Sequence, residues 1–270
     1  MNCFLHNNTI NDTTSHKETV HGSDFLFKKS DITELDLENH DLTDVGVLSD
    51  LTWFTSVNLG YNQISDISPL GGLTQLMHVR LSNNKIVDIS PLAKLTRLQH
   101  IFLANNQISD VSALSTLGRL QTLILSDNKI ADISPLSRLY LMESLCLSGN
   151  AISDISALEK VGSLGDFTTL DLSYNQIKHI DVLSKFTGLI SLGLRANQIG
   201  DISPLTNITT LKELFLGRNQ ISDVRPLANL KHLTWLGLKG NPISIEDVAW
   251  LQERLPECNI CFGDECDDLD

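Results

Sequence analysis

Three cysteines near the C-terminal end have the spacing that most resembles a metal site in this chain. Cys258, Cys261 and Cys266 form the pattern Cys-x₂-Cys-x₄-Cys beside an acidic tail, and cysteine thiolates are ligands of zinc. A structural zinc site needs four ligands, and no fourth ligand lies within sequence reach. Cys258 and Cys261 also fall within an expected closing strand. We therefore expect no metal here and no cofactor elsewhere in the chain.

Regularly spaced aspartates are a second candidate for metal binding, in this case calcium. They stand at Asp44, Asp66, Asp88, Asp110, Asp132, Asp154, Asp201 and Asp223. The Gly-Gly-x-Gly-x-Asp repeat of calcium-binding β-rolls is missing, and an aspartate at the start of a turn can instead cap free backbone amides. His179 and Asp181 break the pattern in the seventh turn, which we interpret as tolerated drift.

The sequence contains no motif that predicts catalysis. It has no phosphate-binding glycine loop, no His-Glu-x-x-His and no nucleophile elbow, so we expect no enzymatic activity and assign no catalytic role to Cys146. The five cysteines are odd in number and scattered, which favours reduced thiols over a disulfide framework. The opening residues show neither a basic start nor a long apolar run. These features predict a cytoplasmic protein, with export by a route that needs no recognisable signal peptide as the alternative.

The charge balance argues against two classes of partner. The 270 residues include 33 acidic and 20 basic side chains, which gives a net charge of −13. Such a field repels phosphate backbones and anionic lipid surfaces, and no stretch approaches the ~20 apolar residues of a spanning helix. We therefore expect neither nucleic acid nor membrane as a partner.

The chain is built from an internal repeat, and an asparagine marks each unit. The asparagines follow one another at a constant interval, which is stretched once, after the fifth of them, and then resumes; they are Asn62, Asn84, Asn106, Asn128, Asn150, Asn175, Asn197, Asn219 and Asn241. His40 takes the same place in the first unit, which makes ten turns. The asparagine amide can both donate to and accept from backbone groups that the bend would otherwise leave buried and unpaired.

Each repeat predicts one strand and one short turn. The alternation in Leu123-Ile124-Leu125 indicates a strand with its leucines inward. The phrase Asp-Ile-Ser-Pro-Leu follows, as at residues 66–70, and a serine before a proline is a helix-start signal because the hydroxyl can cap free amides. Only about six residues remain before the next strand, which favours a 3₁₀ turn. Stacked units then form a solenoid with a parallel sheet on its concave side.

Both ends of such a stack need to be covered. At the C-terminal end, Ser244 precedes a helix over 245–255 that Pro256 stops, and residues 258–262 alternate as a last strand. The predicted division is a disordered segment over 1–22, a small lid at 23–31 within a solenoid of ten repeats over 23–244, a C-terminal cap over 245–262 and an acidic tail over 263–270. Three extra residues between Val161 and Phe167 predict a bulge on the convex side, or a binding loop.

The phrase Asn-Gln-Ile-Ser-Asp-Ile-Ser-Pro-Leu at residues 62–70 closely resembles the 22-residue repeats of the bacterial internalins. It is similar, more loosely, to the repeats of the eukaryotic leucine-rich-repeat regulator that binds protein phosphatase 1. The resemblance spans about residues 32–262 and implies an α/β solenoid of the leucine-rich-repeat kind, a right-handed superhelix that recognises proteins through its concave sheet. Secreted internalins also carry a signal peptide, a helical N-terminal cap and an immunoglobulin-like domain, and we expect none of these here.

Outward-facing strand positions are where a partner would bind. Polar residues would serve the fold equally well there, so exposed aromatic side chains are interface candidates. They form two clusters: His78, Arg80, His100, Phe102 and Ile124, and Glu213, Phe215, Arg218, Trp235 and Lys239. We predict a monomeric, non-catalytic scaffold that binds another protein. A secreted or surface adhesin of internalin type that recognises a host protein is the alternative.

Overall fold

Each repeat contributes one three-residue strand to a single sheet in the computed structural model, which describes residues 32–161 and 167–263. The predictions for residues 1–22 and 23–31, for the extra residues before Phe167 and for the tail after Gly263 lie outside the described residues. The strands are β1 (Glu34–Asp36), β2 (Ser56–Asn58), β3 (His78–Arg80), β4 (His100–Phe102), β5 (Thr122–Ile124), β6 (Ser144–Cys146), β7 (Thr169–Asp171), β8 (Ser191–Gly193), β9 (Glu213–Phe215), β10 (Trp235–Gly237) and β11 (Asn259–Cys261).

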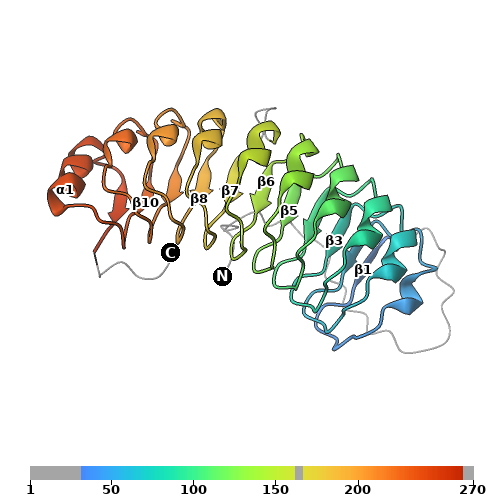
Figure 1. The fold of residues 1–270 in the computed structure, drawn as a ribbon. Coiled ribbons are helices and arrows are strands. Elements are labelled where there is room, and N and C mark those ends of the chain that lie inside the picture. Colours follow the sequence, from blue (N-terminus) through green and yellow to red (C-terminus); the bar gives the residue numbers. More distant parts are fainter. Residues whose placement is uncertain (1–31, 162–166, 264–270) are drawn as a thin grey trace.

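The eleven strands are parallel and follow sequence order across the sheet. Pairing joins residues one repeat apart, as in Leu123 with Leu145. The interval between β6 and β7 is longer than the others, yet Leu145 still pairs with Leu170, so the extra residues leave the register intact. Figure 1 shows the resulting arc, with the strands along its inner side and the short helices along its outer rim.

The core runs the whole length of the arc between these two layers. The middle residue of β2 to β10 and the residue two positions later point inward, and Leu123 and Leu125 are both fully buried. A third layer comes from the outer turns, where Leu70 and its counterparts are buried. No unit can bury these apolar side chains alone, so each depends on its neighbours.

The outer turns are 3₁₀ helices, as their short length predicts. They are η1 (Gly46–Leu48), η2 (Ser68–Gly72), η3 (Ser90–Lys94), η4 (Ser112–Thr116), η5 (Ser134–Arg138), η6 (Ser156–Lys160), η7 (Asp181–Lys185), η8 (Ser203–Leu205) and η9 (Arg225–Leu227). The expectation that serine caps them is wrong. Ser68 is the first residue of η2, and Asp66 Oδ1 accepts its backbone N–H at 2.8 Å. Eight repeats have this aspartate bond.

The asparagines satisfy the backbone at the bend after each strand. In Asn128, Nδ2 donates to the carbonyls of Leu103 and Leu125, both at 3.0 Å, and Oδ1 accepts the N–H of Ile108 at 3.0 Å. All nine asparagines combine these two roles. One side chain thus ties the bend of its own repeat to the preceding repeat.

A helix and a strand cover the C-terminal end of the core. α1 (Ile245–Arg254) begins at Ser244, whose Oγ accepts the N–H of Asp247 at 3.0 Å. Leu251 and Leu255 are buried against the last repeat. β11 then adds to the edge of β10, so the predicted closing strand is present.

Candidate functional site

The first and third residues of each strand face the concave side of the sheet, opposite the leucine core. Side chains in register on neighbouring strands lie side by side there, although they are one full repeat apart in the chain. Residues two positions after each strand form a further outward column. The two predicted clusters lie at different places along this surface, one on β3 to β5 and the other on and just after β9 and β10.

The first cluster, which we call the N-terminal patch, consists of His78, Arg80, His100, Phe102 and Ile124. The imidazole rings of His78 and His100 stack with their centroids 4.8 Å apart and their planes at 7°. Beside them, the guanidinium carbon of Arg80 lies 5.4 Å from the centroid of the Phe102 ring. These four side chains are half-buried, so they hold one another in place and still meet solvent.

The two histidines of the N-terminal patch resist protonation. Burial lowers the pKa of His78, an effect that the nearby Glu34 carboxylate opposes and Arg80 reinforces. Burial also lowers the pKa of His100, with further lowering from His78 and from Arg80. Both rings are therefore neutral at pH 7, and Arg80 supplies the positive charge of the patch.

The second cluster, the C-terminal patch, consists of Glu213, Phe215, Arg218, Trp235 and Lys239. Glu213 Oε2 accepts a hydrogen bond from the Ser191 hydroxyl at 3.0 Å. Trp235 is half-buried, and its indole Nε1 is enclosed without a hydrogen-bond acceptor among the described residues. An indole N–H usually finds a partner when it is buried, so this donor is left unsatisfied inside the protein, where no atom of a partner reaches it.

The expectation that all the outward apolar residues face water is wrong for two of them. Ile124 and Phe215 are each only 6% exposed, although neither belongs to the leucine core. Phe215 is in register with Gly193 on one side and Gly237 on the other. Because glycine has no side chain, nothing projects from the neighbouring strands at these positions, and the ring has room to lie against the backbone. In contrast, Arg218 is exposed and Lys239 is half-buried.

Between the two patches lies a group of buried polar residues that sequence reasoning did not single out. Asp171 Oδ1 accepts the N–H of Ser173 at 3.0 Å, and burial raises the pKa of the Asp171 carboxyl. A Cβ on Gly193 would lie 2.3 Å from Asp171 Oδ1, so the carboxyl requires glycine there. Arg195 is 5% exposed, with its guanidinium carbon 5.5 Å from the Tyr174 ring centroid. Reading the outward column after the strand would have found Arg195.

The cysteines also differ from expectation. Cys146 and Cys261 are disulfide-bonded, so the prediction of reduced thiols is wrong for them, and Cys146 is fully buried. They lie five strands apart in the sheet, which excludes a bond between the two. Cys258 is a free thiol, and burial raises its pKa to about 11, so it is unreactive at neutral pH.

Neither a metal-binding cluster nor a membrane-spanning helix is present within residues 32–161 and 167–263. In these ranges, no three His, Cys, Asp or Glu side chains come close enough together to hold a metal ion. No helix of the same ranges combines the length and the apolar character that a membrane span requires.

Three family models match the chain, and together they cover most of it. The model "Leucine Rich repeats (2 copies)" matches residues 74–116 and 119–160. The model "Leucine-rich repeat" matches residues 153–251, and a further "Leucine Rich repeat" model matches 28–49 and 50–67. A comparison with curated proteins found no match.

Solved structures of bacterial and plant proteins share this architecture. An internalin (inlF) from Listeria monocytogenes is 33% identical over 87% of this chain and 74% of that chain, with a TM-score of 0.72. An internalin C2 (inlC2) from the same species is 31% identical over 79% and 81% of the two chains, with a TM-score of 0.55. The ectodomain of the plant receptor kinase GASSHO1/SCHENGEN3 from Arabidopsis thaliana is 23% identical over 78% and 27%, with a TM-score of 0.68, and shares the fold alone. The chain belongs to the internalin-like leucine-rich-repeat family.

Proposed function

We propose that this protein is a non-catalytic scaffold that binds another protein through the concave face of its sheet. The observation that carries the proposal is the N-terminal patch, where Arg80 and Phe102 pair and His78 and His100 stack on an open face. The strand positions involved need no aromatic or cationic side chain for folding. Leucine-rich-repeat proteins are protein-interaction scaffolds, and their solenoids present extended concave surfaces for binding.

Aromatic and arginine side chains that are already held in place are effective binding anchors. Binding costs free energy when flexible side chains become ordered, and both pairs of the N-terminal patch are ordered before a partner arrives. The C-terminal patch adds Trp235, whose side chain is half-buried at the first position of β10 and so offers part of its ring to a partner. Both anchors lie on one sheet, so a single elongated partner can contact the two patches together.

The proposal is tested by affinity capture with purified protein, followed by calorimetry with the captured partner. We expect Arg80→Ala with Phe102→Ala, and separately Trp235→Ala, to weaken partner binding at least about tenfold, because anchor residues each contribute about 2 kcal/mol or more. Val87→Ala removes an apolar side chain that is 55% exposed and lies away from both patches, and it should bind normally. Capture that is equal for all four proteins would contradict the proposal.

A secreted or surface adhesin that recognises a host protein is the second candidate. It is favoured by the 33% identity to a Listeria internalin and by the disulfide-bonded Cys146 and Cys261, since disulfides persist mainly outside the reducing cytosol. The cytoplasmic location and the monomeric state stay predictions. Fractionation of the producing cells distinguishes the cytoplasmic from the exported location. Light scattering on the purified protein measures its oligomeric state.

A further inference from the structure

The seventh repeat lacks a bond that eight other repeats have. His179 stands where those repeats have aspartate, so no carboxylate is available at that position to accept the backbone N–H at the start of η7. Losing a cap of this kind costs about 1 kcal/mol. Lys178, directly before it, replaces the small residues found at this position in the repeats on either side, Ser153 and Gly200. Both changes move the charge at these two positions in the positive direction, while Asp181, at the place of Ser156 and Ser203, adds one carboxylate to the same turn.

Gln176 and Gln198, like Gln220 at the same position of the ninth repeat, lack the lysine partner that Gln63 and Gln107 have. In earlier repeats a lysine of the next repeat donates to the glutamine amide, as Lys85 Nζ does to Gln63 Oε1 at 3.2 Å and Lys129 to Gln107 at 3.5 Å. The corresponding residues of the seventh and eighth repeats are Gln176 and Gln198, so two amides lie next to each other and no lysine bridges them.

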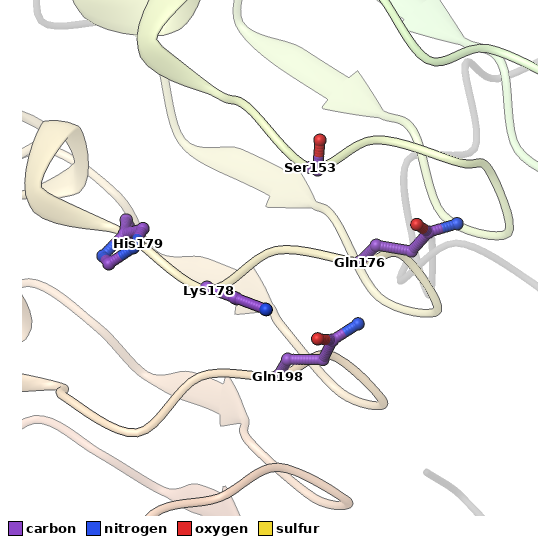
Figure 2. Close-up of a pocket in the computed structure, with 5 residues that line it drawn as sticks. All are labelled: Ser153, Gln176, Lys178, His179 and Gln198. Carbon is purple, nitrogen blue, oxygen red and sulfur yellow. The ribbon is translucent and has the colours of Figure 1, made fainter.

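The unbridged amides and the new cation line one pocket. Its volume is about 360 Å³, and its lining consists of Ser153, Gln176, Lys178, His179 and Gln198. Figure 2 shows Lys178 between His179 and the two glutamines, with its ammonium group directed toward the side where the Gln198 amide lies. Among the described residues, none of these five side chains makes a hydrogen bond or an ion pair. The pocket is on the flank of the solenoid, between β7 and η7, away from the concave face.

We propose that this pocket binds an oxyanion, a carboxylate or a phosphate group carried by a small molecule or by a peptide. Lysine offers three donors and no acceptor, and each glutamine amide offers two donors, so the lining suits a ligand that is rich in acceptors. The row on the outer flank continues with Asp154 on one side of His179 and Asp201 on the other. His179 removes a carboxylate from this row, and the carboxylate of the seventh turn stands instead at Asp181, two residues later and outside the pocket lining. Natural sequences break local structural rules at functional or strained sites.

The test is a titration of the isotope-labelled full chain with sodium phosphate and, separately, with sodium acetate, followed by NMR. Sodium chloride keeps the ionic strength constant. We expect saturable shifts of the side-chain amide signals of Gln176 and Gln198 with at least one of the two anions. The anion that binds with the higher affinity identifies the preferred group. Shifts that do not saturate with either anion would overturn the proposal.

Three variants distinguish a built site from general attraction between charges. Lys178→Ala should lower the affinity for the anion at least about tenfold, because a hydrogen bond to a charged group contributes about 1.5–3 kcal/mol. Lys129→Ala removes an ammonium group from another repeat and should leave the affinity unchanged. His179→Asp should also lower the affinity for the anion. The same change should raise the melting temperature, because the new carboxylate can accept the backbone N–H at the start of η7. Equal affinity in the Lys178→Ala and Lys129→Ala variants would show an adventitious ion only and would refute the site, while leaving the concave-face proposal untouched.

Discussion

Ile101 and Phe102 are adjacent on β4 but lie on opposite faces of the sheet. Ile101 is fully buried, and its register partners are also apolar, Val79 on one side and Leu123 on the other. The partners of Phe102 are unlike one another, Arg80 and Ile124. The inward position must fit between two identical layers, so its chemistry is constant. The outward position does not face the leucine core, so its residue type can vary from strand to strand without disturbing that core.

The strongest test of this difference removes an inward side chain. Ile101→Ala should lower the free energy of unfolding by about 2–5 kcal/mol, because a fully buried site loses transfer energy and is left with a cavity. Urea unfolding followed by circular dichroism measures the loss. Phe102→Ala, one residue away, is the matched control and should cost clearly less. Equal losses of unfolding free energy at the two positions would contradict the view that the inward face contributes more to stability than the outward face.

The asparagine at the bend should have an intermediate effect. Asn128→Ala leaves the carbonyls of Leu103 and Leu125 and the N–H of Ile108 without their partner. Orphaned backbone groups of this kind cost about 1–3 kcal/mol. Gln107→Ala removes an exposed amide from the same part of the solenoid and should change stability by no more than about 0.5 kcal/mol. The melting temperatures of the two variants give the comparison, and an unchanged value for Asn128→Ala would remove the asparagine ladder from the account of stability.

The smallest expected effect is a pH dependence that comes from the outward face. The pKa values of His78 and His100 are lowered in the folded state, so below the ordinary histidine value near 6.5 the unfolded chain binds more protons than the folded chain. Stability should therefore fall as the pH drops from about 7 to 5. His78→Ala with His100→Ala should flatten this part of the profile. Carboxylates such as Asp66, whose pKa is lowered by its bonds to Ser68, lose their contribution only at more acidic pH. An unchanged slope in the double variant would show that the histidines do not couple to folding.

The sequence predicted the repeated parts of this molecule well because they are set by local rules. Strands, 3₁₀ turns and the C-terminal helix follow from spacing and from residues such as Ser244. What was missed depends on neighbours that lie one repeat away in the chain. The near-complete burial of Phe215 depends in part on glycines on both flanking strands, and Asp171 depends on the glycine beside it. The sequence predicted that the Ser68 hydroxyl caps the turn. In the structure the turn already includes Ser68 as its first residue, so its backbone N–H is instead capped by Asp66.

Every strand in the sheet is bonded only to its predecessor and its successor. A molecule pulled by its two ends would therefore unfold stepwise, one repeat after another from an end. Each lost unit would release a thread of roughly 70 Å, the fully extended length of one repeat. The unit that spans β6 to β7 is longer and would release slightly more, so its step could be told apart from the others.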